Sequence, residues 1–218
     1  MRVFSKAMAL ALIGLFGLAG CAESPEGSSL PYYLSADFTP HWDSDDADLP
    51  RIAPRVAAFD FVDQAGDRFG SEDVAGKIYV ANFFFVRCSG ICPLMATQLS
   101  RVLAAFQDDP DVVLVSHSVT PSMDTVPILE HYAAANQIDA KTWRLLTGDR
   151  DEIYRLARGS YFAESNAELE STENDFLHTE NVVLVDRVGR LRGVYNGTLP
   201  LDMARLIEDI RTLKSESA

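Results

Sequence analysis

The sequence reads KIYVANFFFVRCSGICP from Lys77 to Pro93, and this stretch decides the fold. Its first ten residues, Lys77 to Val86, form a nearly continuous apolar run, which is typical of a strand buried on both faces of a sheet. Apolar residues recur at helical spacing after Pro93, and proline suits the first turn of a helix. The pattern therefore predicts a buried strand, a turn that carries Cys88 and Cys92, and then a helix.

The segments around this unit alternate between strand and helix patterns. Further strands are predicted at 58–62, after Gly66, and at 112–119, 144–146, 181–186 and 190–195, and further helices at 125–137, 149–158 and 200–213. Asp124 is predicted as the N-cap of the helix 125–137, and Gly159 as the end of the helix 149–158. These elements predict an α/β fold, in which helices flank a central mixed β-sheet and a hairpin lies on its N-terminal side.

The first twenty residues read as a separate leader. Arg2 and Lys6 precede the apolar run Met8 to Leu18, which has the length of a signal-peptide core and is too short to span a bilayer. Leu18-Ala19-Gly20-Cys21 resembles the bacterial lipoprotein cleavage box, which implies a lipidated Cys21. An ordinary signal peptide or an uncleaved anchor is the alternative. We therefore expect a lipoprotein signal peptide at 1–20, a lipidated flexible tether at 21–50, in which 37–42 could pack as an arm, and a folded domain at 51–218.

Composition excludes one class of partner. The chain has 19 Lys and Arg against 32 Asp and Glu, which gives a formal net charge of −13. Nucleic acid is not expected as a partner, because binding a phosphate backbone needs clustered cations. Lipidation of Cys21 would leave Cys88 and Cys92 as a pair in an exported, oxidising compartment, where such a pair forms a dithiol or a disulfide.

The cysteine pair lies where chemistry is expected in an α/β sheet, at the carboxyl end of a buried strand. Cys92 would begin the following helix, whose positive end favours a thiolate, so at least one sulfur should be nucleophilic and ready to bind a metal ion. A separation of four positions lets both sulfurs face one small cation, and it also suits a disulfide. A structural disulfide, or two buried thiols, is the competing interpretation.

A metal site would need a third ligand, and the chain has four histidines: His41, His117, His131 and His178. His117 lies inside a predicted strand and His131 on a predicted helix, which favours structural roles, and His41 lies in the tether. His178 ends a polar loop before a strand, where it could reach the cysteines or have no such role. Two thiolates and an imidazole form a soft donor set that suits copper, as Cu(I) or Cu(II). Zinc accepts the same donors, but we find no fourth ligand for it.

Four motifs, in order along the chain, resemble the SCO/SenC family of copper-handling, thioredoxin-like proteins. They are Asn82-Phe83-Phe84-Phe85 with Cys88-Ser89-Gly90-Ile91-Cys92-Pro93, Ser118-Val119-Thr120-Pro121-Ser122-Met123-Asp124-Thr125, Trp143-Arg144-Leu145-Leu146-Thr147-Gly148-Asp149, and Asp175-Phe176-Leu177-His178-Thr179 before Val183-Leu184-Val185-Asp186. The resemblance runs from about Arg51 to the C-terminus. It implies a thioredoxin-like fold, copper binding by Cys88, Cys92 and His178, and an auxiliary place near the site for Asp124.

Two departures from the family pattern bear on the choice of partner. Thr120 stands where family members commonly carry Asp, and Ser89-Gly90-Ile91 is a less bulky spacer than is common between the cysteines.

The resemblance implies a copper chaperone that delivers copper to, or matures, the binuclear copper site of a respiratory terminal oxidase. The cysteine pair would equally serve a thiol-disulfide oxidoreductase that reduces cysteines of the oxidase or of another periplasmic partner, or a copper or redox sensor, so enzymatic activity stays open. The spacing C-x-x-x-C differs from the C-x-x-C of general reductases, which favours the chaperone. The expected partners are a copper-receiving oxidase subunit, a periplasmic thiol reductant, and a membrane, inner or outer, that holds the lipid of Cys21 on its periplasmic face.

Overall fold

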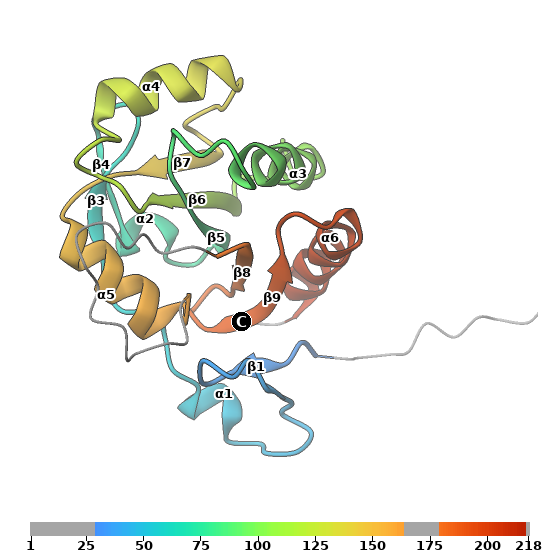
Figure 1. Cartoon of the computed structure of the whole chain (residues 1–218). Coiled ribbons are helices and arrows are strands. Elements are labelled where there is room, and N and C mark those ends of the chain that lie inside the picture. The colour runs from blue at the N-terminus through green and yellow to red at the C-terminus, as the bar shows by residue number, and fades with distance from the viewer. Residues whose placement is uncertain (1–28, 164–178, 217–218) are drawn as a thin grey trace, which may run out of the picture.

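The computed structural model describes residues 29–163 and 179–216, and its centre is a five-stranded mixed sheet (Figure 1). The strands are β5 (Ile78–Phe84), β6 (Val112–Ser118), β7 (Trp143–Leu146), β8 (Asn181–Val185) and β9 (Leu191–Asn196), in the spatial order β7-β6-β5-β8-β9. β5, β6 and β7 are parallel, whereas β8 runs antiparallel to both of its neighbours, β5 and β9. β9 therefore points the same way as β5.

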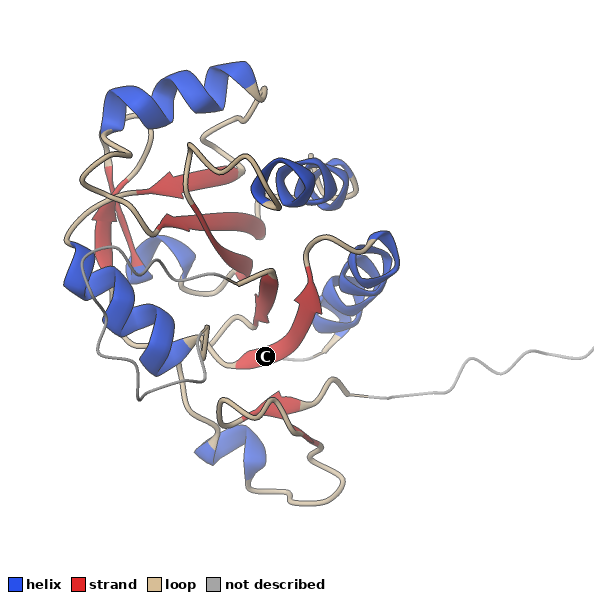
Figure 2. Cartoon of the chain, in the orientation of Figure 1, coloured by secondary structure: helices blue, strands red, loops and turns tan. Residues whose placement is uncertain are grey.

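Helices cover both faces of this sheet and make a three-layer sandwich (Figure 2). One face packs against α3 (Cys92–Ala104), α4 (Val126–Ala135) and α6 (Pro200–Ser215). The other face packs against α5 (Arg150–Ser160), α2 (Ser71–Val74) and an antiparallel hairpin of β3 (Asp60–Val62) and β4 (Arg68–Gly70). The predicted mixed sheet, its flanking helices and the hairpin before it are confirmed.

β5 confirms the strand that was predicted from the apolar run after Lys77. All seven of its residues are buried, because layers on both faces cover a central strand. β6 is buried over its whole length for the same reason. The helix predicted after the cysteines is α3, which buries Met95, Leu99 and Val102 in the core. The unit that decides the fold therefore forms as the pattern predicts.

Two helix ends differ from the sequence prediction. Asp124 is not the N-cap of α4; Thr125 holds that position, and the carboxylate of Asp124 accepts a hydrogen bond from Val86 instead. Gly159 does not end α5, which continues to Ser160. The first prediction is wrong because a contact from another segment takes the carboxylate of Asp124. The second is wrong because Gly159 has no positive φ of the kind that ends a helix.

One edge of the sheet gathers the segments that follow its strands. β5, β6 and β9 run in the same direction, so the turn 85–91, the loop 119–125 and residues 197–199 all leave the sheet at the same edge. We call this the cysteine edge, because the turn 85–91 contains Cys88 and leads directly into Cys92. β8 runs the opposite way and begins at this edge, just after the described chain resumes at Thr179.

The described chain begins with an arm that packs on the domain. The arm contains β1 (Tyr32–Tyr33), β2 (Pro40–His41) and α1 (Leu49–Ile52), and β1 lies against β9. Tyr32 and Leu49 are buried. Part of the stretch that we expected as a tether is therefore folded, while its division from the leader and from the domain stays a prediction. Within the described ranges, no helix is both long enough and apolar enough to cross a bilayer.

A buried arginine clamps the start of the arm. Arg192 on β9 is 2% exposed and donates hydrogen bonds to the carbonyls of Leu30 and Pro31. Its guanidinium also pairs with the carboxylate of Glu216, just after α6, at 2.8 Å, and lies over the ring of Tyr32 at 4.2 Å. The first described residues and the last ones are thus held by the same side chain.

Candidate metal centre

The two cysteines lie together at the turn between β5 and α3. α3 begins at Cys92, with Ile91 as its N-cap and Pro93 in its first turn. Cys88 is partly exposed, whereas Cys92 is buried with 8% exposure. Both are free thiols, and their side chains hydrogen-bond each other. The structure therefore brings together the sulfur pair that the spacing predicted.

The two thiols differ in acidity because their surroundings differ. Burial works against ionisation of Cys88, but hydrogen bonds from the side chain of Cys92 and from the backbone N–H groups of residues 90–92 outweigh it and lower the pKa of Cys88. Burial is the main cause that raises the pKa of Cys92 to about 12, and the hydrogen bond with Cys88 adds to the rise. The position of Cys92 at the helix N-terminus favoured it as the thiolate; the structure favours Cys88, because Cys92 is too deeply buried.

A buried carboxylate ties the cysteine turn to the next strand. Asp124 is 1% exposed, and its Oδ2 accepts hydrogen bonds from the hydroxyls of Ser118 at 2.6 Å and Thr120 at 2.8 Å. The backbone N–H of Val86, two residues before Cys88, donates to the same carboxylate at 3.3 Å. Thr120, which departs from the family pattern, thus has a local role as a donor to Asp124. The sequence placed Asp124 near the site only through the resemblance, and its residue type predicted an N-cap and not this contact.

An apolar wall lies beneath the sulfurs. Cys92 lines a small internal cavity together with Phe84, Met95 and Tyr132, and the rings of Phe84 and Tyr132 are 5.7 Å apart. Burial is the main cause that raises the pKa of Tyr132 to about 12, and the nearby cysteines and Asp124 raise it further. A neutral phenol and a thioether on this side keep water away from Cys92.

Two residues predicted for the site, Cys21 and His178, lie outside the described residues. Over 29–163 and 179–216, no three His, Cys, Asp or Glu side chains form a group that could hold a metal ion. His117 is fully buried among aromatic rings, as a structural residue would be, and His131 is exposed on α4. The sulfur pair fits a soft ion such as copper, and no described His, Asp or Glu joins it as a third donor.

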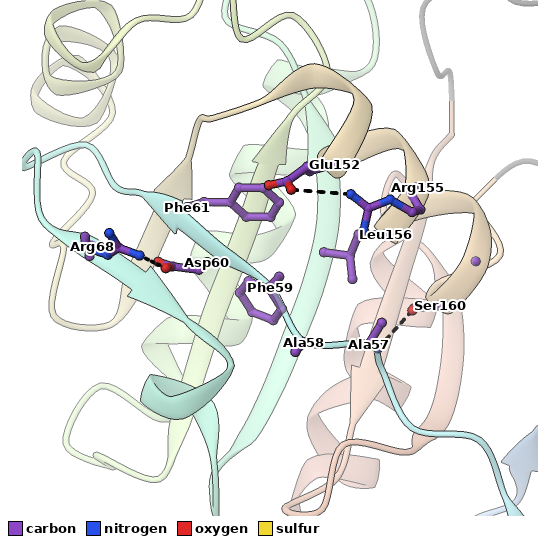
Figure 3. Close-up of a pocket in the computed structure, with 11 residues that line it drawn as sticks. Ala57, Ala58, Phe59, Asp60, Phe61, Arg68, Glu152, Arg155, Leu156 and Ser160 are labelled. Carbon is purple, nitrogen blue, oxygen red and sulfur yellow. Dashed lines mark hydrogen bonds and ion pairs between the residues drawn. The ribbon is translucent and has the colours of Figure 1, made fainter.

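A cavity of about 630 Å³ lies on the opposite face of the sheet, between β3 and α5 (Figure 3). Phe59, Phe61 and Leu156 line it, and two acid–arginine ion pairs stand at its rim. No sulfur or imidazole lines this cavity, so it offers no donor for a soft metal ion. Sequence patterns did not predict it, because its two walls come from segments about ninety positions apart.

The sequence matches a known family over most of its length. The family described as SCO1/SenC matches residues 49–215. The SCO1 protein homolog of Bacillus subtilis is 29% identical over 161 residues, which are 72% of this chain and 81% of that protein. A Stutzerimonas stutzeri protein, whose name assigns it copper binding only provisionally, is 28% identical over 71% of this chain and 74% of its own length.

Solved structures agree with the sequence matches. A SCO1/SenC family lipoprotein from Bacillus anthracis is 27% identical, with a TM-score of 0.65, over 74% of this chain and 95% of that chain. BsSco, described as a member of the Sco family of cytochrome c oxidase assembly proteins and as containing a disulfide switch, is 26% identical, with a TM-score of 0.63, over 75% and 95%. The thioredoxin-like fold implied by the resemblance is confirmed. Because the family match spans well over half of the sequence, this chain belongs to the SCO1/SenC family.

Proposed function

We propose that this chain binds copper through Cys88, Cys92 and His178 and passes it to the binuclear copper site of a respiratory terminal oxidase. The observation that carries the proposal is the pair of free, mutually hydrogen-bonded sulfurs at the cysteine edge. Thiolates suit Cu(I), and imidazole accepts Cu(II) as well. Membership of the family supports the proposal, as do a relative named for copper binding and another, BsSco, described as an oxidase assembly protein.

The place where the described chain resumes supports His178 as the third ligand. His178 is joined to Thr179, and the strand that follows, β8, begins at the cysteine edge beside β5. The hydroxyl of Thr179 accepts a hydrogen bond from the N–H of Asn181 at 3.0 Å, which fixes the entry to β8. Among the described histidines, His117 is enclosed in the core, His131 is exposed on α4 and His41 lies on β2 of the arm. None of the three forms a metal-holding group of donors in the described residues, so none competes for this role.

The chain's own residues suit a metal ion that is held and then given up. Hydrogen bonds stabilise the thiolate of Cys88, so this sulfur accepts a soft cation readily. Cys92 must release its proton to solvent when the cation binds, and its burial favours return of the proton when the cation leaves. Asp124 meanwhile keeps the turn in place through Val86.

Thiol-disulfide exchange is a second candidate function, and the asymmetry of the pair favours it. The thiolate of Cys88 would attack a partner's disulfide and form a mixed disulfide, releasing one partner thiolate. Cys92, after losing its proton, would then attack the sulfur of Cys88 and release the second partner thiolate. The partner is reduced by two electrons, and this chain is left with a Cys88–Cys92 disulfide. The disulfide switch described for BsSco is consistent with such a pair.

A copper titration of the reduced protein, followed by absorption, tests the first candidate. We expect one copper ion per chain, and at least a tenfold loss of affinity in His178→Ala, because one of three donors is removed. His131→Ala is the matched control and should bind as the wild type does, since His131 is exposed on α4. Equal affinities of wild type and His178→Ala would remove His178 from the site, and insulin-disulfide reduction at thioredoxin-like rates would favour the oxidoreductase.

We also propose that a lipid on Cys21 holds the chain at the periplasmic face of a membrane. The cleavage-box resemblance supports this, and the Bacillus anthracis relative is described as a lipoprotein. Mass spectrometry of the membrane-extracted protein should find an acylated N-terminal Cys21, and Cys21→Ser should abolish the acylated species. An unmodified Cys21 in the membrane fraction would contradict the proposal.

A further inference from the structure

Large apolar side chains are exposed mainly at one edge of the molecule. Nine of them are exposed among the described residues, and Leu201, at 74% exposure, is the most open. Six of the nine lie in or next to the segments that leave the sheet at the cysteine edge: Ile91, Leu94, Met123, Ile128, Leu199 and Leu201. Single exposed apolar residues are ordinary, but a group at one edge marks an interaction site.

These six residues come from three segments that the topology places at the same edge of the sheet. Ile91 and Leu94 flank the start of α3, Met123 and Ile128 flank the start of α4, and Leu199 and Leu201 flank the start of α6. All three helices begin at the cysteine edge, because they follow the parallel strands β5, β6 and β9. α3 and α6 lie next to each other on one face of the sheet (Figure 1).

A close contact joins two of these segments directly. A Cβ placed on Gly197, between β9 and α6, would be 2.9 Å from Cε of Met95, which lies in the first turn of α3. The starts of α3 and α6, which carry these exposed residues, therefore lie next to each other at the cysteine edge. We call the three segments 85–94, 119–128 and 196–201 the apolar collar.

The apolar collar is also nearly free of charge. Its only exposed charged side chain is Arg87, because Asp124 is buried, whereas 23% of the whole chain is charged. Of the acids next to its segments, Glu180 and Asp202 are hydrogen-bonded to Asn196, whereas Glu130 on α4 is exposed. Depletion of charge around an apolar centre is the compositional signature of a protein interface.

We propose that the apolar collar docks a protein that receives copper from this chain, through an uncharged, apolar face of that protein. The proposal rests on the proposed copper function, because a metal ion held by thiolates passes between proteins only when donors of both meet at one site. The collar contains the cysteine turn, so a partner seated on it would bring its own ligands to Cys88. An uncharged collar matches an uncharged face, since a charged face would lose hydration without gaining an ion pair.

Two other occupants fit less well. An anionic membrane surface is disfavoured by the net charge of −13 and by the presence of only one cation, Arg87, in the collar. A second copy of this chain would set two cysteine edges against each other and close the path to any recipient. Both remain outcomes of the experiment below.

The experiment measures docking separately from copper binding. The probe is the soluble copper-site domain of a terminal oxidase from the same organism, added to full-length protein with and without copper. The collar variant is Leu94→Ser with Leu201→Ser. The matched control is Ile52→Ser with Val188→Ser, which changes two exposed apolar residues on α1 and on the β8–β9 turn, away from the cysteine edge.

We expect the collar variant to keep the wild-type copper affinity within about twofold. Copper transfer at limiting probe should be at least tenfold slower than in the control variant. The copper-free collar variant should also bind the probe at least tenfold more weakly, as seen by amide NMR shifts. Equal transfer and equal probe binding in the collar and control variants would overturn the docking surface.

The remaining outcomes separate this inference from the proposed function. Failure of the wild type to bind copper would overturn the proposed function and with it the role of the partner as a copper recipient. Probe binding to the copper-free protein would still decide, by itself, whether the collar is the docking surface. Dimerisation of the wild type that is lost in the collar variant would assign the collar to a second copy and overturn the partner proposed. If the wild type and the control variant bound anionic vesicles and the collar variant did not, the collar would be assigned to a membrane surface. That result would also overturn the partner proposed.

Discussion

At the scale of single residues, Asp124 shows how a buried carboxylate can support a metal site without contacting the metal ion. Two hydroxyls and one backbone N–H donate to it, and the N–H belongs to Val86, on the path to Cys88. A buried carboxylate with three donors is satisfied, whereas its donors would be left without a strong acceptor if it were removed. Asp124 is therefore a positioning residue for the turn.

Asp124→Asn should destabilise the protein by about 1–3 kcal/mol, because the amide has one acceptor oxygen where the carboxylate has two. Urea unfolding measures this loss. Copper affinity should fall as well, while Asp151→Asn, an exposed substitution on α5, should change neither quantity appreciably. Wild-type stability in Asp124→Asn would show that the carboxylate does not hold the turn.

His117 is a second buried polar residue, but it has no polar partner. Neither ring nitrogen makes a hydrogen bond in the described structure, and its ring lies 5.4–5.8 Å from those of Phe59, Phe61, Phe83 and Tyr161. Burial lowers the pKa of His117 to about 3, so the folded protein holds it neutral.

Acid should therefore weaken the fold through His117. The unfolded chain binds a proton here as pH falls below about 6.5, and the folded protein does so only near pH 3, so stability is complete above pH 6.5 and declines between these values. Between pH 7 and pH 4.5 the loss is about 3 kcal/mol. Urea unfolding at pH 7 and at pH 4.5 measures this loss, which should be smaller in His117→Leu than in the wild type by that amount. An identical loss in the wild type and in His117→Leu would rule the mechanism out.

Residue types alone could identify the cysteines but not their chemistry. The four-position spacing predicts that Cys88 and Cys92 meet, and they do. Which sulfur ionises first depends on burial by residues such as Tyr132 and Leu145, which come from α4 and from β7 and line the same cavity as Cys92. Such surroundings are formed by tertiary packing, so no local pattern contains them.

At the scale of elements, continuous patterns predicted the strands well and the helix ends poorly. β5 and the first half of β6 lie within apolar runs of the sequence, because a strand covered on both faces is mostly apolar. Asp124 has the residue type of an N-cap, but its carboxylate accepts hydrogen bonds from Ser118, Thr120 and Val86 instead of from α4. Helix ends depend on such competition, which is decided by distant segments.

Gly159 provides a test of one corrected helix end. It lies inside α5 without a positive φ, and a Cβ added to it would meet no atom within 4 Å. Gly159→Ala should raise the free energy of unfolding by about 0.5–1 kcal/mol, because alanine loses less backbone freedom on folding. Gly189→Ala is the contrasting variant and should destabilise, since Gly189 has φ of 89°. Destabilisation by Gly159→Ala in urea unfolding would restore glycine as the end of the helix.

At the scale of the whole molecule, the sequence could predict the domain but not how its first residues attach. Acidic and small residues in 22–50 are typical of a tether, yet Tyr32 and Leu49 are buried. The attachment depends on Arg192, which is about 160 positions away from Leu30 and Pro31. A long-range clamp of this kind has no signature in either segment.

Removing the clamp should free the arm. Arg192→Met should destabilise the protein by at least about 2 kcal/mol, because Glu216 and two carbonyls lose a buried donor. Limited proteolysis should cut the arm faster than in the wild type. Arg211→Met, which breaks an exposed pair within α6, should behave like the wild type, and equal proteolysis of the two variants would show that Arg192 does not retain the arm.

The clamp also gives the molecule two opposite poles. α6 starts at the cysteine edge and runs 16 residues back along the sheet, about 24 Å, before Glu216 accepts the N–H of Leu30. The chain upstream of Ser29 therefore joins the fold at the end of α6 that lies away from the cysteine edge. An attachment through that upstream segment would leave the cysteine edge open to an approaching partner.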